Sequence, residues 1–184
     1  LQLRLYQVYL ENTPKDDRDD LEHFLKWSQT LLYDFNELDR YLVDAQKILT
    51  NLTGLKEVEQ WSLGELDLTL FQKKYIRFFE YMYTWYNAFQ SNLINDGLAY
   101  QGLAYRKAAE QISVSKFSFE EVWFVGLNAL TNAEKYIINY FLSNNKAQLF
   151  WDADEHYVKN EDHEAGLFFR QHFKECGEQK CSNF

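Results

Sequence analysis

A dense group of carboxylate and imidazole side chains lies between residues 152 and 164. Such side chains are common ligands of divalent metals and common general acids and bases. A calcium loop beginning at Asp152 would need glycine at its sixth position and glutamate at its twelfth, where the chain has Tyr157 and His163. The spacing therefore excludes an EF-hand, and a metal-dependent hydrolase using Asp152, Asp154, His156 and His163 is left as one alternative. The whole group is Asp152, Asp154, Glu155, His156, Glu161, Asp162, His163 and Glu164.

Other catalytic spacings are incomplete in this chain. Gly97 and Gly102 have the spacing of phosphate-loop glycines, but leucine and alanine follow where lysine and serine or threonine are required. No Gly-x-Ser-x-Gly nucleophile elbow occurs. Cys176 and Cys181 lie in a polar tail at a spacing that fits neither a redox pair nor a zinc set. Since no apolar run of eighteen residues occurs either, we expect a cytoplasmic protein without membrane contact.

The charge balance limits contact with nucleic acids. The 28 acidic and 19 basic residues give a formal net charge of −9. Such an excess repels a phosphate backbone unless the cations are segregated on one surface, and the near-neutral, aromatic middle third is where that surface would lie. The alternative interpretation of its cations is a set of solvated helix faces. The candidate DNA-contacting residues are Lys73, Lys74, Arg77, Arg106 and Lys107.

The composition favours long helices. Aromatic residues make up 18% of the chain, which contains one proline and seven glycines, too few for a turn-rich sandwich. Residues 1–10 fit the spacing of either a strand or a helix, of which we favour the helix. Apolar stripes predict helices from Leu21 through to about Gly54 and over residues 68–94, with a polar loop over residues 11–20. The apolar face of the third helix is broad, which predicts that this helix packs between other elements.

A short internal repeat follows the third predicted helix. The run Asn95-Asp96-Gly97 should stop that helix, and GLAYQGLAY over residues 97–105 leads into a further helix through Ile112. A spacing of five residues is too short for a solenoid unit, so the repeat is either a coincidence or a sign of close packing.

The last third of the chain has the pattern of a βαβ unit. Residues 122–125 and 147–151 are apolar, β-rich runs, and Thr131 with Glu134 forms a capping box that opens the helix between them. We expect two buried parallel strands, with any chemistry at their carboxyl ends, followed by a final helix with Asn160 as its N-cap. The predicted fold class is therefore mostly α with a small parallel β component: a lobe of long helices followed by this α/β unit.

Five strings of the sequence are specific enough to indicate a family. They are LLYDFNELDRYLVDA (31–45), GLAYQGLAYR (97–106), FVGLNALTNAE (124–134), WDADEHY (151–157) and EAG (164–166). These strings resemble a Bacteroidetes family of PD-(D/E)XK nucleases that is similar to AddB-type recombination nucleases, in which a region related to superfamily 1 helicases precedes the nuclease domain. The resemblance implies that this chain is an internal piece of the helicase-like region. Residues 1–118 would then resemble helical subdomain 1B, and residues 119–184 part of the P-loop helicase core subdomain 1A.

The resemblance also implies the loss of motor chemistry. In active helicases of this superfamily the corresponding strand ends in Asp-Glu, whose carboxylates hold magnesium and position the attacking water. Here Gly126 and Leu127 follow the strand, which makes a degenerate Walker B motif. The next strand leads into Asp152, Asp154 and Glu155, similar to a degenerate phosphate-sensor motif. We therefore expect no enzymatic activity in this piece and neither ATP nor Mg²⁺ as a cofactor.

Three functions remain open at this level. The leading one is a non-catalytic scaffold or DNA-path module of a DNA repair and recombination nuclease. Its partners would be the rest of the parent chain and a helicase–nuclease partner subunit, with weak DNA contact through the parent. The second is a helical protein-interaction module that exposes the aromatic face between Phe71 and Phe89. The third is the metal-dependent hydrolase described above.

Overall fold

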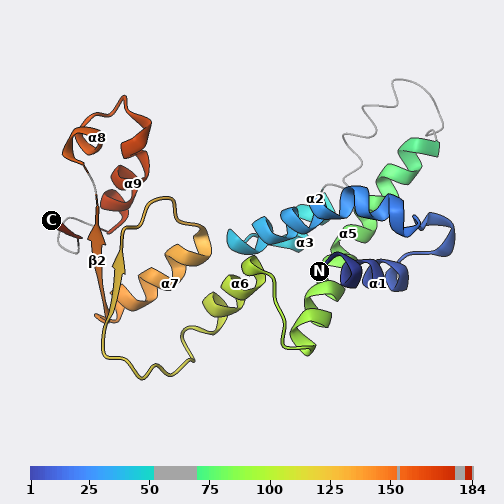
Figure 1. Ribbon diagram of the computed structural model, residues 1–184, viewed down its shortest axis with the longest axis horizontal. Coiled ribbons are helices and arrows are strands. Elements are labelled where there is room, and N and C mark those ends of the chain that lie inside the picture. Colours follow the sequence, from blue (N-terminus) through green and yellow to red (C-terminus); the bar gives the residue numbers. More distant parts are fainter. Residues whose placement is uncertain (52–69, 153, 177–180, 184) are drawn as a thin grey trace. The chain divides into compact units, whose positions relative to one another are not determined.

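The computed structural model describes residues 1–51, 70–152, 154–176 and 181–183 (Figure 1). The chain divides into two compact units, Leu1–Arg106 and Lys107–Phe184. The boundary between these units lies after Arg106, whereas the domain boundary predicted from the sequence lies after residue 118. The described part of the first unit is helical, and the strands belong to the second. The predicted fold class, mostly α with a small parallel β component, is confirmed.

The first unit is built around one long helix. Helix α5 (Leu70–Asn95) contacts α1 and α3, and α1 contacts α2. The core between these helices is aromatic, with Phe24, Phe35, Trp85 and Phe89 almost fully buried. The other elements of this unit are α1 (Gln2–Asn12), the 3₁₀ helix η1 (Lys15–Asp17), α2 (Leu21–Arg40), α3 (Ala45–Asn51) and α6 (Gln101–Gln111), which continues past the end of the unit.

The helix predicted from Leu21 is two helices, which corrects the sequence interpretation. Helix α2 begins as predicted, because the Asp20 carboxylate accepts a hydrogen bond from the backbone N–H of His23 at 2.9 Å. It ends at Arg40 because Leu42 adopts a left-handed backbone (φ 52°), and the N–H of Val43 returns to the carbonyl of Leu38 at 2.9 Å. This is a Schellman turn with leucine in the position that glycine usually takes, so the sequence carries no stop signal there.

The two glycines of the internal repeat have different structural roles. Gly97 ends α5 in a left-handed turn (φ 68°), as predicted. Gly102 lies where α6 meets α2, and a Cβ at this position would be 2.3 Å from the backbone oxygen of Asn36. Its N–H donates to the Asn36 side-chain oxygen at 2.8 Å. Close packing, one of the two explanations of the repeat, therefore holds at Gly102.

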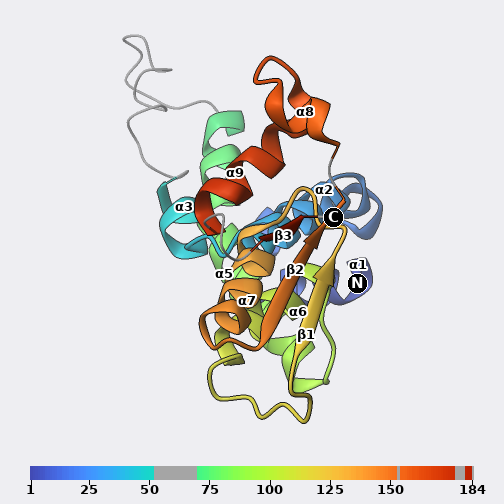
Figure 2. The ribbon, with the colours of Figure 1, turned by 90° about the vertical axis from the view of Figure 1, so that its left-hand side faces the viewer.

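The second unit contains the predicted βαβ arrangement (Figure 2). Strands β1 (Val122–Val125) and β2 (Ala147–Trp151) pair in parallel, with α7 (Asn132–Ser143) between them in sequence and in contact with β2. The Thr131–Glu134 capping box is present. A third strand, β3 (Cys181–Asn183), pairs in parallel with β2, although the sequence was interpreted there as a polar tail.

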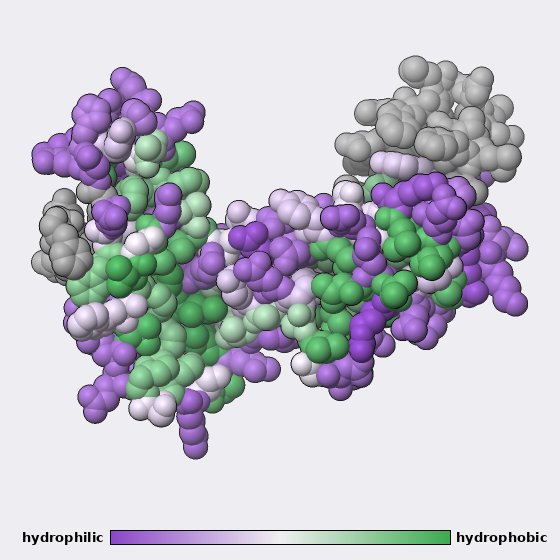
Figure 3. All heavy atoms as spheres, in the orientation of Figure 1, coloured by the Kyte–Doolittle hydropathy of each residue, from purple (hydrophilic) through white to green (hydrophobic). Residues whose placement is uncertain are grey.

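One face of the sheet departs from the expected burial. Leu149 and Trp151 are buried beneath α7 and its neighbours, but Trp123 and Val125 on β1 are 63% and 66% exposed. Figure 3 shows hydrophobic residues gathered at the surface over these strands. The prediction of two fully buried strands is therefore wrong for β1, whose side chains alternate between the core and the exposed face.

The last predicted helix begins later than expected, at Leu167, and the prediction of Asn160 as its N-cap is wrong. Asn160 is instead the C-cap of the short helix α8 (Glu155–Lys159), whose N-cap is Asp154. The 3₁₀ helix η2 (Glu164–Gly166) then leads into α9 (Leu167–Cys176). In the part of the chain that the structure describes, no helix is long and apolar enough to cross a membrane.

Candidate functional site

The carboxyl end of β1 is where the sequence placed the degenerate Walker B residues. Gly126 has a left-handed backbone (φ 67°), and its N–H donates to the carbonyl of Phe150 on β2 at 3.0 Å. Leu127 packs against the core of this unit. Because residues with a side chain rarely adopt the backbone conformation of Gly126, the strand ends in a geometry that suits glycine and is unfavourable for an aspartate or glutamate.

The space beside this strand end is filled by a ring stack. His172 on α9 lies 3% exposed, and its Nε2 is 2.9 Å from the carbonyl oxygen of Asn128. Its imidazole stacks on the Trp151 indole with ring centroids 5.2 Å apart. No local pattern in the sequence links His172 with Trp151, because this contact forms only when α9 packs against β2.

The acidic residues after β2 serve mainly as local caps. Asp152 is exposed, and the Asp154 carboxylate accepts the N–H of His156 at 2.8 Å as the N-cap of α8. The Lys159 ammonium pairs with Glu155 and lowers the pKa of that carboxyl. His163 Nδ1 lies 3.2 Å from the N–H of Ala165, which it caps.

These acids and imidazoles are not gathered into a metal centre. Asp154, Glu155 and His156 line a shallow, open depression on α8, whereas His163 lies in the turn that follows. Within the described ranges, no three His, Cys, Asp or Glu side chains are arranged to hold a metal ion.

The cations proposed to contact DNA have different environments. Lys73 is exposed, whereas the Lys74 side chain lies outside the described residues. Arg77 is 53% exposed and donates to Asp17 at 2.7 Å, and Lys107 donates to Glu110 at 2.7 Å. Arg106 is largely buried, with 16% of its side chain exposed. Arg106 is therefore engaged within the protein, in a cluster that the sequence did not reveal.

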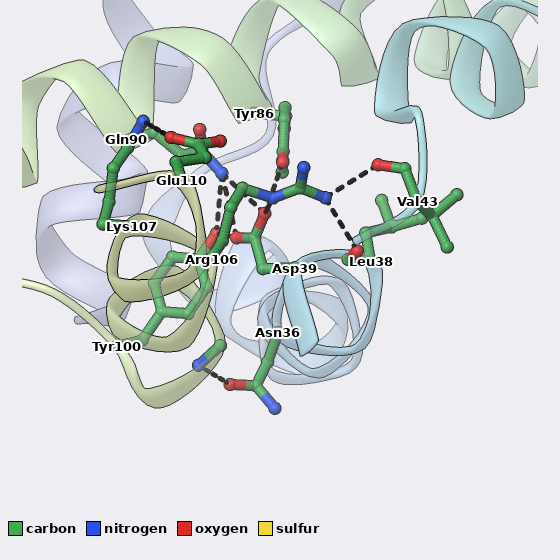
Figure 4. Close-up of polar contacts among 11 residues, drawn as sticks. Asn36, Leu38, Asp39, Val43, Tyr86, Gln90, Tyr100, Arg106, Lys107 and Glu110 are labelled. Atoms are coloured by element: carbon green, nitrogen blue, oxygen red, sulfur yellow. Dashed lines mark hydrogen bonds and ion pairs between the residues drawn. The ribbon is translucent and has the colours of Figure 1, made fainter. Parts of the chain in front are cut away.

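That cluster is centred on Asp39, which is fully buried in the last turn of α2 (Figure 4). Its Oδ1 accepts hydrogen bonds from the Tyr86 hydroxyl at 2.5 Å and from Arg106 Nε at 2.5 Å. Gln90 Nε2 lies 3.0 and 2.9 Å from the two carboxylate oxygens, and the Tyr100 hydroxyl donates to Oδ2. Every donor comes from α5, α6 or the turn before α6, so this carboxylate ties three segments together.

The protonation states of the cluster residues suit a structural role better than a catalytic one. Burial, together with the negative charge of Asp39, raises the pKa of the Tyr86 and Tyr100 hydroxyls above the ordinary value of 10.0. Both tyrosines therefore stay neutral donors at physiological pH. A carboxylate surrounded by donors in this way has no free lone pair aimed at solvent, and the cluster contains no exposed nucleophile.

Arg106 also holds the backbone of the α2–α3 turn. One guanidinium nitrogen, NH2, donates to the carbonyls of Leu38 at 2.9 Å and Val43 at 2.7 Å (Figure 4). On the other side of that turn, Leu38 and Val43 line an apolar groove of about 390 Å³ together with Ile48 and Met82. The Asp39 cluster therefore fixes one wall of a surface groove.

The groove carries an acidic rim. Asp34 and Glu37 lie along it on α2. Glu37 is paired with Arg40 at 2.9 Å. Asp34 has no cationic partner among the described residues, and desolvation raises the pKa of its carboxyl above 3.8. The groove thus combines an apolar floor with one carboxylate, that of Asp34, for which the described residues provide no counter-ion.

Two strings quoted for the family resemblance meet in this cluster. Asp39 and Val43 belong to residues 31–45, and Tyr100, Gly102 and Arg106 belong to residues 97–106. The signal that could have revealed the contact was the presence of an acid in one string and an arginine in the other. Comparison of the chain with protein-family models, with curated proteins and with solved structures gave no match in any of the three.

Proposed function

We propose that this chain is a non-catalytic, helicase-like module of an AddB-like DNA repair and recombination nuclease. In this proposal the module has a scaffolding or DNA-path role within the parent protein, alongside a helicase–nuclease partner subunit. The observation that carries the proposal is the end of β1, where Gly126 in a left-handed conformation and the packed Leu127 stand in place of two carboxylates.

The exposed sheet face supports the same proposal. Parallel sheets are normally covered on both faces by helices, because their strands are joined by crossover connections. Here α7 contacts one face, while Trp123 and Val125 project from the other face into solvent. Such a face suits a sheet that is completed by further elements of a larger α/β domain.

Thermal unfolding with and without Mg²⁺-ATP tests the non-catalytic assignment. A nucleotide that binds the folded chain raises its stability by mass action, by about 2.7 kcal/mol at a concentration one hundred times the Kd. We expect no change in the melting temperature. The same measurement on Leu127→Ala, which alters the strand end, controls for nonspecific effects of the nucleotide. A micromolar Kd accompanied by hydrolysis would refute the proposal.

Single-stranded DNA binding tests the DNA-path role. We expect weak, salt-dependent binding that falls when Lys73, Lys74 and Arg77 are changed to glutamine. Loss of three phosphate contacts should reduce the slope of log K against log salt concentration by about 2. The matched control changes the exposed Lys15, Lys26 and Lys47 to glutamine. An equal loss in both triple variants would point to net charge alone and would contradict a local DNA path.

A helical protein-interaction module is a second candidate, favoured by the groove beside α2. The aromatic face of α5 is not wholly buried, since Tyr75 is 41% exposed and Phe79 lines the groove. Because Asp34 has no lysine or arginine partner among the described residues, we propose as occupant an amphipathic segment of a partner protein with a lysine or arginine beside its apolar side chains.

A peptide-display selection on the immobilised chain tests this second candidate. We expect recovered peptides to combine apolar residues at helical spacing with a basic residue, and to bind Ile48→Asp and Asp34→Lys variants more weakly. Tyr33→Asp and Asp16→Lys, at exposed positions that do not line the groove, are the matched controls. If the recovered peptides bound all four variants as tightly as the parent chain, or if the chain dimerised through Ile48, the proposed occupant would be rejected.

A further inference from the structure

A second cavity in the first unit is small and has aromatic walls. It has a volume of about 140 Å³ and lies where α1, η1, α2 and α5 approach one another. Five of its lining residues are aromatic: Tyr9, Trp27, Phe78, Tyr81 and Trp85. An apolar cavity of ~150 Å³ is large enough to hold benzene, so this one has room for a single compact group.

The aromatic rings are fixed by contact with one another. The Trp27 ring centroid lies 6.0 Å from that of Trp85 and 5.1 Å from that of Phe78, and Phe78 lies 5.3 Å from Trp85. Burial raises the pKa of Tyr9 and of Tyr81, so both phenols remain neutral at physiological pH. The faces of aromatic rings are negative, so each ring face that borders this cavity favours a cation.

Two carboxylates add to this negative character. Asp17 accepts hydrogen bonds from Arg77 at 2.7 Å and from the Tyr81 hydroxyl at 3.3 Å. Asp19 accepts one from Trp27 Nε1 at 3.1 Å. In the described part of the chain Asp19 is paired with no lysine or arginine. Among the described side chains, the partner of this carboxylate is therefore a neutral indole.

Arg77 shows which chemistry this environment accepts. Its guanidinium lies at the cavity with 53% of the side chain exposed, and the hydrogen bond to Asp17 raises the pKa of Arg77 above its ordinary value. The chain itself thus places one organic cation against Asp17, beside the aromatic walls. No lysine or arginine of the described residues is placed in this way against the neighbouring Asp19.

We propose that this cavity binds an organic cation, a quaternary ammonium or guanidinium group, with Asp19 as its counter-ion and the indoles of Trp27 and Trp85 as its aromatic walls. Diffuse cations of this kind are attracted to aromatic faces, and most strongly to tryptophan. The inference rests on the first unit alone and does not depend on the helicase-like function proposed above.

Titration of the full chain with small probes tests the ligand class. Tryptophan fluorescence should report binding, since Trp27 and Trp85 both line the cavity. Tetramethylammonium and guanidinium are the cationic probes, and tert-butanol and urea are their neutral counterparts of similar shape. We expect saturable binding of at least one cation in the millimolar range, and the preferred cation distinguishes an ammonium from a guanidinium ligand. Equal responses to cation and neutral probe, or no saturable response to any probe, would overturn the proposal.

Three substitutions locate the binding. Asp19→Asn keeps the shape and the hydrogen-bond acceptor but removes the charge, so cation affinity should fall about tenfold. Asp16→Asn makes the same change at an exposed acid outside the cavity and should leave affinity unaltered. Arg77→Gln should strengthen binding, because it removes the resident cation and frees Asp17. Equal losses in Asp19→Asn and Asp16→Asn, or weaker binding in Arg77→Gln, would reject the site.

Discussion

At the scale of single residues, Arg106 shows how burial changes the meaning of a charge. A cationic residue in a near-neutral, aromatic stretch was predicted to face a phosphate backbone, yet the structure places it against the buried Asp39. Withdrawing two charges from water is costly, and good geometry with additional hydrogen bonds is what offsets that cost. Here Tyr86, Gln90 and Tyr100 supply those bonds.

Removing the cation from this pair should destabilise the protein strongly. Arg106→Met leaves the Asp39 carboxylate buried without its counter-ion, and we expect a loss of about 3–5 kcal/mol in the free energy of unfolding. Arg106→Lys should recover only part of it, because one ammonium cannot match the fork that reaches Asp39, Leu38 and Val43. Urea denaturation measures both changes.

The control for the Arg106 variants is the exposed ion pair of Arg4 and Asp96. Arg4→Met should cost less than about 1 kcal/mol, because solvent screens a surface pair. If Arg106→Met cost no more than Arg4→Met, the Asp39 cluster would not be a determinant of stability.

Asp34 should make stability depend on pH in the opposite sense to a salt-bridged acid. Its folded-state pKa is raised by desolvation above 3.8, so its stabilising contribution is complete below pH 3.8 and is lost as the pH rises through the folded pKa. Asp34→Asn removes this loss. We expect the variant to melt at a higher temperature than the parent at pH 7, with the difference vanishing as the pH falls below about 4.

A pair of pH series distinguishes this effect from a general reduction in negative charge. Asp16→Asn changes the net charge equally at an exposed position of η1 and should not reproduce the pH-dependent difference. If Asp34→Asn melted at a lower temperature than the parent at pH 7, the ionised Asp34 carboxylate would stabilise the folded protein, and the prediction would be wrong.

At the scale of elements, local signals predicted where helices and strands begin better than where they end. Thr131 and Gly97 act as the predicted cap and stop, and Asp20 caps the helix predicted from Leu21, because each makes its hydrogen bonds within a few residues. The break after α2 depends on Leu42 in a left-handed conformation, which the distant Arg106 supports by binding the carbonyls on either side. A long-range contact of that kind leaves no local pattern in the sequence.

The candidate site was predictable only in part for the same reason. The strand ends at Gly126 and Asp152 follow from the βαβ pattern. The aromatic cavity and the Asp39 cluster each combine residues from three or more segments, and periodicity assigns those residues simply to buried faces. Their chemistry becomes visible only once the helices are packed.

Helix packing at Gly102 gives a prediction opposite to helix propensity. Alanine is favoured over glycine by about 1 kcal/mol in a helix interior, yet a Cβ here would lie 2.3 Å from the Asn36 backbone oxygen. We expect Gly102→Ala to lower the free energy of unfolding by about 1–3 kcal/mol, as overpacking does elsewhere. Ala104→Gly, at an exposed position two residues further along α6, measures propensity alone and should cost about 1 kcal/mol. A neutral or stabilising Gly102→Ala would show that α2 and α6 do not need this close approach.

At the scale of the whole molecule, the two units differ in how completely they cover their apolar residues. The first has an aromatic core enclosed by α1, α2 and α5. The second has a smaller core on one side of its sheet and an exposed apolar face on the other. A parallel sheet with one uncovered face, in which β1 is an edge among the described strands, is a surface on which further chains can assemble.

This uncovered face should make the chain self-associate in solution. Val125 is 66% exposed on β1, beside the exposed Trp123 indole, and a lysine at position 125 would place a charge in the middle of the apolar face. We expect sedimentation velocity to show concentration-dependent association of the parent chain that Val125→Lys reduces. Val114→Lys is the matched control, because Val114 is 79% exposed but lies outside the sheet. If both lysine variants weakened association equally, added charge would be the cause, and a parent chain that stayed monomeric at every concentration would show that the exposed face does not mediate assembly.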